Sequence, residues 1–293
     1  LRDIDEGEAV IKYGAVIGRA TNPIHAGEWV HTHNLRTHLD EAQTYAYEPK
    51  PMEQAPAQHG TFQGFLRPDG RVGIRNEIYI IPTVGCVNGI CKRLERVSQK
   101  LIRGSLDGIY ALTHPWGCSQ LGQDAANLRE LLCSIARNPN AAFVLFVGLG
   151  CENNRLCDIR EELSDRDNVA YLTCQEVEDE LTEGYRTLCD FADRAAEMSR
   201  ETVELEQLCI GLKCGGSDGF SGLTANPLVG QMSDRLVACG GRAVLTEVPE
   251  MFGAEQRLMN RCRDRETYAR YCKLIADFRD YYTAQGYPGY ENP

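Results

Sequence analysis

Residues 77–89 read EIYIIPTVGCVNG, and this stretch decides the fold of the chain. Its first part, Glu77–Val84, is nearly continuous in apolar residues, which is typical of a strand that helices cover on both faces. Gly85 then allows a sharp turn, and Gly89 begins a segment with helical periodicity that extends to Lys100. A buried strand, a short loop and a helix are the start of a βαβ unit, so the stretch predicts a parallel sheet.

The same alternation of apolar strands and amphipathic helices continues along the chain. Further strands are predicted at Gly108–His114, Ala141–Val147, Val169–Cys174, Leu208–Leu212 and Arg242–Val248. Further helices are predicted at 123–136, 156–163, 177–206, 227–239 and 254–263. We therefore expect an α/β fold of parallel-sheet βαβ units in two halves, with a first α/β domain over 61–206 and the start of a second over 207–293.

The residues before the first α/β domain have a different pattern. Short β-like pieces separated by glycines occupy residues 1–45, as in small β modules. Residues 46–60 contain three prolines with little periodicity, and they predict an extended linker.

Composition excludes several classes of function. The chain has 293 residues, with 31 Lys and Arg against 42 Asp and Glu, for a formal net charge of −11. Nucleic-acid binding needs clustered Lys and Arg against the phosphates, and no basic stripe is present. No apolar run approaches the ~20 residues of a membrane span, and the acidic residues 1–6 lack the pattern of a signal peptide. The sequence therefore predicts a cytoplasmic protein with no nucleic-acid partner and no membrane partner.

Thirteen cysteines with irregular spacing are present, and no Cys-x-x-Cys pair occurs. This pattern argues against zinc ribbons, thioredoxin-like motifs and a disulfide scaffold, and it favours reduced thiols. Several cysteines lie among helix-forming residues, where a small buried side chain is the simpler interpretation. Cys86, Cys118, Cys151 and Cys214 differ, because each stands beside a glycine just after an apolar run.

Polar residues gather in the loops that follow the predicted strands. In open α/β sheets, ligands bind at the carboxyl ends of the strands, where glycines and helix N-termini allow close approach. Loops rich in Gly, Cys, Ser, Asn, Glu or His follow five of the six strands, at 85–88, 114–120, 148–154, 213–222 and 247–250. The loop 213–222 matches neither a Walker sequence nor Gly-x-Gly-x-x-Gly. A small carboxylate therefore fits this loop as well as a phosphate does.

His31 and His33 form a second candidate site. Residues i and i+2 of a strand project to the same face, so both imidazoles can bind one metal ion, or one can bind while the other acts as a base. From the spacing alone, a surface pair with no role fits equally well.

Several longer strings, in the same order along the chain, resemble the altronate/galactarate dehydratase family of sugar-acid hydro-lyases. They are 70–76 (GRVGIRN), 82–89 (PTVGCVNG), 114–122, 148–154, 214–219 (CGGSDG) and 224–227 (TANP). The string 246–256 (TEVPEMFGAEQ) is most similar to the altronate branch. The resemblance covers essentially the whole chain.

This resemblance implies an organisation. A small β-clip module precedes the α/β domains in the family, so we expect residues 1–45 to be part of that module, with His31–Asn34 in its closing segment. Family members continue beyond the position of Pro293 into a further glycine-rich catalytic region. We therefore expect a fragment that lacks the C-terminal remainder, and we expect activity from the longer protein.

The resemblance also implies a reaction, the dehydration of a sugar acid such as D-altronate to 2-keto-3-deoxy-gluconate in hexuronate catabolism. It implies a divalent metal as well, usually Fe²⁺, with Mn²⁺ as the alternative. Removing the proton next to a carboxylate places a second negative charge on it, which a metal or oriented N–H groups must stabilise. A base takes the C2 proton, and an acid protonates the leaving C3 hydroxyl.

Candidate residues for these roles follow from the strand-end loops and the resemblance. As metal ligands we expect His31, His33, Cys118 and Cys151. As substrate contacts we expect Asn88, Ser119, Gln120, Ser217 and Asp218. As base or acid we expect His114, Glu152 and Glu247.

Three other interpretations stay open. One is a galactarate or related aldarate dehydratase. Another is an iron–sulfur dehydratase that uses three of Cys86, Cys118, Cys151 and Cys214 as cluster ligands. The last is a non-catalytic sugar-acid-binding module. In each case the partner is a small sugar acid, and an exposed β-clip edge would support a homodimer.

Overall fold

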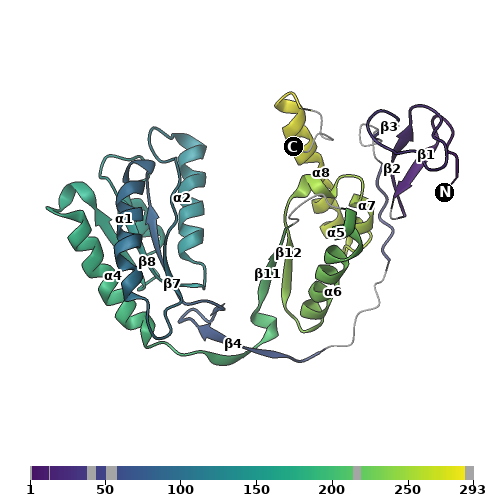
Figure 1. Cartoon of the computed structure of the whole chain (residues 1–293). Coiled ribbons are helices and arrows are strands. Elements are labelled where there is room, and N and C mark those ends of the chain that lie inside the picture. The colour runs from purple at the N-terminus through teal and green to yellow at the C-terminus, as the bar shows by residue number, and fades with distance from the viewer. Residues whose placement is uncertain (1, 13, 38–43, 51–57, 214–218, 288–293) are drawn as a thin grey trace. The chain divides into compact units, whose positions relative to one another are not determined.

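The computed structural model describes residues 2–12, 14–37, 44–50, 58–213 and 219–287. The chain divides into two compact units. The first unit contains residues 1–58, 209–238 and 242–293, and the second contains residues 59–208 and 239–241. Both units combine helices with strands, which confirms the predicted α/β class (Figure 1).

A four-stranded parallel sheet lies at the centre of the second unit. Its strands run in the order β7-β6-β8-β9, and they are β6 (Glu77–Pro82), β7 (Gly108–Ala111), β8 (Ala141–Gly148) and β9 (Val169–Thr173). Parallel neighbours need crossover connections, and helices supply them here. All four strands begin at the predicted residue, so the parallel sheet expected from residues 77–89 is confirmed.

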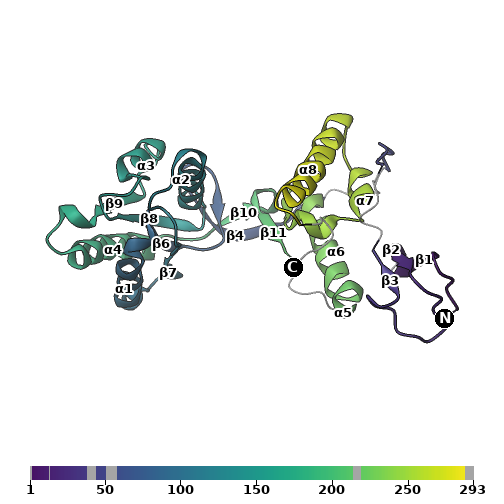
Figure 2. The ribbon, with the colours of Figure 1, turned by 90° about the horizontal axis from the view of Figure 1, so that it is seen from above.

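Helices cover both faces of this sheet, as Figure 2 shows. One face carries α1 (Asn88–Ser98) and α4 (Glu180–Ala196), and the other carries α2 (Gly122–Ala136) and α3 (Leu156–Glu162). Along β6 the side chains alternate, so that Ile78 and Ile80 pack toward α1 and α4, while Tyr79 and Ile81 pack toward α2 and α3. Burial on both faces explains the nearly continuous apolar character of the strand.

A second, antiparallel sheet in this unit overturns one helix prediction. It has the order β10-β4-β5, with β4 (Thr61–Leu66), β5 (Val72–Gly73) and β10 (Glu201–Glu204). The prediction of one helix over 177–206 is wrong beyond Ala196. Residues 201–204 pair with β4, and Arg200 donates to the carbonyl oxygens of Gln63 and Ile74. These distant partners outweigh the local helical propensity.

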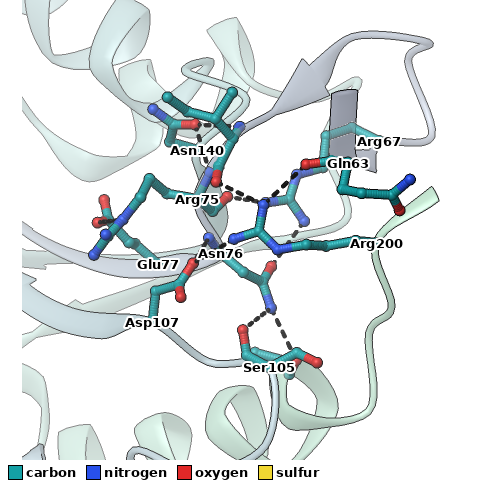
Figure 3. Close-up of polar contacts among 11 residues, drawn as sticks. Gln63, Arg67, Arg75, Asn76, Glu77, Ser105, Asp107, Asn140 and Arg200 are labelled. Atoms are coloured by element: carbon teal, nitrogen blue, oxygen red, sulfur yellow. Dashed lines mark hydrogen bonds and ion pairs between the residues drawn. The ribbon is translucent and has the colours of Figure 1, made fainter. Parts of the chain in front are cut away.

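A buried polar centre joins several segments at the amino end of β6 (Figure 3). The Asn76 side chain is fully buried, and its amide donates to the carbonyl oxygens of Ser105 at 3.1 Å and Ala195 at 2.9 Å. Its Oδ1 accepts from Arg67 Nη1 at 3.0 Å, and its backbone N–H donates to Asp107 at 2.8 Å. Asn76 thereby connects β6 to the segment before β7 and to the end of α4.

Arg67 completes this centre from the turn that follows β4. Its Nε donates to the Pro139 carbonyl at 2.7 Å, and its Nη2 donates to the Arg75 carbonyl at 3.1 Å. Arg67 and Arg200 both lie over the ring of Phe65. Burial lowers the pKa of Arg67 to about 10, which still leaves the guanidinium charged at neutral pH.

Side chains from α1, and from Gln99 directly after it, form hydrogen bonds with the outer side of the edge strand β7. Gln99 Nε2 donates to the Ile109 carbonyl at 3.0 Å. The Ala111 N–H donates to Glu95 Oε1 at 3.1 Å, and the Ala111 carbonyl accepts from Lys92 Nζ at 3.3 Å. Backbone groups that an edge strand would otherwise expose are thus paired within the unit.

In the first unit, the N-terminal residues form a small antiparallel sheet. Its order is β1-β2-β3, with β1 (Ala9–Lys12), β2 (Ala15–Ala20) and β3 (Leu35–Arg36). Val10, Ala20 and Ile24 make its core. The short β pieces predicted in this region are therefore present.

In its described residues, the remainder of the first unit contains a parallel strand pair and four α-helices. The pair is β11 (Cys209–Leu212) with β12 (Arg242–Leu245), and the helices are α5 (Gly219–Leu223), α6 (Ala225–Ala238), α7 (Glu255–Met259) and α8 (Arg265–Ala284). Sequence patterning does not predict α8, which begins where Asp264 Oδ1 accepts from the Thr267 N–H at 2.7 Å. Within the described residues, no helix is long and apolar enough to cross a membrane.

Asn76→Ala should lower the free energy of unfolding by about 2–4 kcal/mol, because it leaves several buried polar groups without their partner. Urea denaturation measures this loss. Asn127→Ala is the matched control, since Asn127 is exposed on α2 and bonds to Gln123 on the same helix; its effect should stay within about 0.5 kcal/mol. Equal losses in the two variants would contradict a structural role for the buried centre.

Candidate active site

The carboxyl ends of β6 and β8 bring a carboxylate and a hydroxyl together. Thr83 directly follows β6, and Glu152 lies in the loop after β8. The Thr83 hydroxyl donates to Glu152 Oε1 at 2.6 Å, and the Gly150 N–H donates to Oε2 at 2.7 Å. Glu152 is only 7% exposed, so both of its oxygens are held in place at this edge of the sheet.

The pKa of Glu152 reflects two opposing effects. Burial by itself raises the pKa, but hydrogen bonds from the Thr83 hydroxyl and from backbone N–H groups, Gly150 first among them, lower it overall. A carboxyl group with a lowered pKa is ionised at neutral pH. Glu152 can therefore accept a proton there, which suits the base among the two predicted roles.

His114 lies near the same carboxyl ends of the strands, and both of its ring nitrogens are hydrogen-bonded. Nε2 is 2.8 Å from the Pro82 carbonyl oxygen, and Nδ1 accepts from the Trp116 N–H at 3.2 Å. With Nδ1 as the acceptor, the hydrogen that faces the Pro82 carbonyl is on Nε2. The imidazole also stacks on the Trp116 ring. These contacts fix the ring, and an acid or base role for His114 stays a prediction.

Two asparagines at the same edge carry buried polar atoms. Asn88, at the start of α1, donates from Nδ2 to the His114 carbonyl at 2.8 Å, while its Oδ1 is buried. Asn154 is 1% exposed, with Oδ1 and Nδ2 both buried. Among the described residues, these three atoms have no hydrogen-bond partner. Buried polar atoms are normally bonded, so a polar ligand or water fits here. Asn88 is one of the predicted substrate contacts. Asn154 is not, although the loop 148–154 that contains it is one of the predicted strand-end loops.

The loop after β7 approaches β6 closely. Gly117 has φ 106°, and a Cβ on it would lie 2.3 Å from the Thr83 carbonyl oxygen, so only glycine fits. Its N–H donates to Gln120 Oε1 at 3.0 Å. Gln120, a predicted substrate contact, thus bonds within its own loop, while Ser119 is exposed and has a left-handed φ of 57°.

Cys86, Cys118 and Cys151 are exposed, and their loops follow the adjacent strands β6, β7 and β8. Their shared edge agrees with the prediction from strand ends. Within the described ranges, however, no three His, Cys, Asp or Glu side chains lie close enough together to hold a metal ion. The predicted residues Cys214, Ser217 and Asp218 lie outside the described residues.

His31 and His33 belong to the first unit. Residues 31–34 form a turn before β3, so the strand geometry assumed for the two imidazoles is wrong. Asn34 makes the turn, because its Oδ1 accepts from the His31 N–H and its Nδ2 donates to the Trp29 carbonyl. Both imidazoles lie against the Trp29 ring, at centroid distances of 4.6 and 5.7 Å. Their binding of a metal stays a prediction.

Glu247 lies in the first unit, two residues beyond β12. Its Oε1 is 3.0 Å from Lys213 Nζ, and its backbone is left-handed, with φ 61°. Such a conformation costs a non-glycine residue about 1–3 kcal/mol. Among the described residues, Ser119 and Glu247 are the non-glycine residues with positive φ, and both were predicted site residues.

Sequence profiles of one family match three regions of the chain. The profile for the D-galactarate dehydratase/altronate hydrolase second domain matches residues 64–196. The D-galactarate/altronate dehydratase C-terminal profile matches residues 205–293, and the altronate/galactarate dehydratase SAF domain matches residues 1–38. The chain belongs to the altronate/galactarate dehydratase family.

Curated members of this family are similar along the whole chain. Altronate dehydratase of Bacillus subtilis (strain 168) is 46% identical over 301 residues, which cover 100% of this chain and 60% of that protein. Altronate dehydratase of Escherichia coli (strain K12) is 46% identical over 299 residues, with the same coverage. Galactarate dehydratase (L-threo-forming) of Escherichia coli (strain K12) is 30% identical over 304 residues, covering 96% of this chain and 57% of that protein. The chain thus spans 60% of the length of these altronate dehydratases.

Three of the strings that resemble the altronate/galactarate dehydratase family lie at two different ends of the parallel sheet. String 70–76 supplies Arg75 and Asn76 to the buried centre at the amino end of β6 (Figure 3). Strings 82–89 and 148–154 instead build the carboxyl edge that holds Glu152. The first string therefore supports the sheet, and the other two form the candidate site.

Glu152→Gln should flatten the pH dependence of stability on the acid side. The folded pKa of Glu152 lies below the ordinary 4.5, so ionised Glu152 adds stability above that value, and this stability is lost as pH falls through the lowered pKa. Melting temperatures measured from about pH 7 to about pH 3 should therefore fall less in this variant than in the wild type. Glu130→Gln, on the exposed side of α2, should behave like the wild type. A curve for Glu152→Gln parallel to the wild-type curve would show that this carboxylate gains nothing from its hydrogen bonds.

Proposed function

We propose that the protein dehydrates a sugar acid, with D-altronate as substrate and a 2-keto-3-deoxy sugar acid as product. The observation that carries this proposal is the 46% identity to two altronate dehydratases along the entire chain. The lower identity to a galactarate dehydratase makes an aldarate the second candidate substrate. A role in hexuronate catabolism, a cytoplasmic location and a homodimer belong to the same proposal.

In this proposal Glu152 takes the C2 proton. Its carboxylate is ionised, buried and held by Thr83 and Gly150, so it presents a fixed acceptor at the edge where α/β sheets bind ligands. The buried amides of Asn88 and Asn154 would contact substrate hydroxyls. A carboxylate with a lowered pKa is a weak base, so the enediolate formed at C1–C2 needs strong stabilisation elsewhere in the site.

A divalent metal, Fe²⁺ or Mn²⁺, is part of the proposal, although no three His, Cys, Asp or Glu side chains of the described residues lie close enough together to hold one. When bound, such an ion would stabilise the negative charge of the enediolate. His31, His33, Cys118 and Cys151 remain its predicted ligands, and no step here depends on their geometry.

The substrate is tested by a keto-acid release assay on a panel of aldonates and aldarates. The assay uses the protein extended to the full length of its altronate dehydratase relatives, with Fe²⁺ supplied. Turnover should be highest with D-altronate, and Glu152→Gln should lower kcat by about 100-fold or more while folding normally. Preferred turnover of galactarate would instead support the second candidate substrate, an aldarate. Binding of altronate, seen as thermal stabilisation, without any turnover would instead favour a non-catalytic module.

Metal dependence is tested on the same protein. Chelation should abolish turnover, and Fe²⁺ or Mn²⁺ should restore it. Elemental analysis should find less metal after His31→Ala and His33→Ala, whereas His25→Ala, an exposed histidine of the same small sheet region, should leave the metal content unchanged. Full activity in chelator would reject the metal. Visible absorbance with acid-labile sulfide would point to an iron–sulfur cluster on the thiols.

A further inference from the structure

A cavity of about 470 Å³ lies at the amino ends of β8 and β9, and all the residues that line it belong to the second unit. Its walls come from the turn after β4, the turn before β9 and the segment that joins α4 to β10. Glu152 follows the carboxyl end of β8. The cavity and the candidate active site therefore lie at opposite ends of the same parallel sheet.

Two buried guanidinium groups line this cavity, those of Arg67 and Arg166. Arg67 is 8% exposed, and the side chain of Arg166 is 10% exposed. The hydrogen bonds that Arg67 makes to the described residues go to uncharged groups, three of which lie in the buried centre of Figure 3. Burial removes the water that stabilises a charge, so a buried cation normally has a counter-ion. Hydrogen bonds alone do not supply one to Arg67.

Arg166 shares its counter-ion with another arginine. Its Nη1 donates to Asp69 Oδ2, and the same oxygen accepts from Arg71 Nε at 3.0 Å and from Arg71 Nη2 at 2.7 Å. The Nε of Arg166 is buried, and it has no hydrogen-bond partner among the described residues. Buried N–H groups are normally bonded, so the position beside Nε lacks an acceptor.

The other charged residues of the cavity wall are more exposed. Arg194 is a third cation, with its guanidinium 4.4 Å from the centre of the Phe143 ring. Asp165, Asp167 and Glu201 also line the cavity, and all three are exposed. Water and salt screen exposed charges much more than buried ones. The buried part of the cavity is therefore positive, although the chain as a whole is acidic.

We propose that this cavity binds a small oxyanion, a phosphate or carboxylate group, through the guanidinium of Arg166 and beside the charge of Arg67. An anionic oxygen supplies the acceptor that Arg166 Nε lacks and a counter-ion for the two buried cations. Guanidinium groups suit this contact, because their planar N–H donors match the oxygens of phosphates and carboxylates. The volume also admits a ligand larger than the anionic group itself. This site does not depend on the proposed dehydration of a sugar acid.

Calorimetric binding of two probes, inorganic phosphate and acetate, to the full-length protein tests the site. Arg166→Met, which removes the charge, should weaken binding of the preferred probe by about 10-fold or more. Arg166→Lys keeps the charge and loses Nε with its planar group, so it should bind about three- to tenfold more weakly than the wild type. Tighter binding of phosphate identifies a phosphate group as the ligand, and tighter binding of acetate identifies a carboxylate.

Arg103→Met is the matched control. Arg103 pairs with Asp193 at 2.7 Å and is not part of the cavity wall, so its variant also removes one ion-paired guanidinium. This variant and Glu152→Gln should bind the preferred probe as the wild type does.

Binding of neither probe to the wild type would overturn the proposal, and so would wild-type affinity in Arg166→Met or Arg166→Lys. Equal weakening in Arg166→Met and Arg103→Met would show a general effect of charge and would also overturn it. If Arg166→Met does not fold, as judged by circular dichroism, Arg166→Lys decides, because it keeps a cation beside Asp69. No turnover is measured, so the result is independent of the proposed function.

Discussion

The arrangement of the second unit depends on the hydrogen bonds between Arg67 and Asn76 at the amino end of β6. Asn76 has no exposed surface, and every polar atom of its side chain is bonded to another segment. A partly satisfied polar group in this place would be more costly than an apolar one, so the segments must meet in one arrangement. Because β6 is the central strand between β7 and β8, this constraint sets where its carboxyl end lies. The position of this end of β6 in turn sets the position of Thr83, and Thr83 holds Glu152 by its hydrogen bond.

Much of the fold could be predicted from residue patterns. The run Glu77–Val84 predicts a strand covered on both faces because every second side chain faces a different helical layer, and the core clusters confirm this. The strand over 201–204 could not be predicted, since its partner β4 lies far away in sequence and outweighs the local helical preference. The turn at 31–34 was missed for a related reason. Asn34 bonds two backbone groups of its own loop, and such a turn overrides the strand that alternating histidines suggest.

The sequence allows a prediction of where the candidate site lies, but it is less informative about the contacts that its residues make. Strand ends rich in Gly, Cys, Asn and Glu predict a site at the carboxyl edge, and Thr83 and Glu152 meet at that edge. Asn154 was missed because nothing in its spacing distinguishes a buried amide from an exposed one. The engagement of both nitrogens of His114 depends on carbonyl and N–H positions that only the folded loop supplies. Residue type thus indicates which groups are available, and backbone geometry decides which of them remain available to a ligand.

The side chains of Lys92, Glu95 and Gln99 along β7 have a consequence for assembly. An open sheet can grow when a strand from another chain adds to its edge, which is a common route to aggregation and to continuous sheets across dimers. Here the outward carbonyls of Ile109 and Ala111 and the N–H of Ala111 are already bonded from the same chain. A strand could add at β7 only by displacing these side chains from their bonds. Copies of this unit should therefore not associate by strand addition at β7, and the strand-end loops beside this edge can lie there without the edge recruiting unrelated chains.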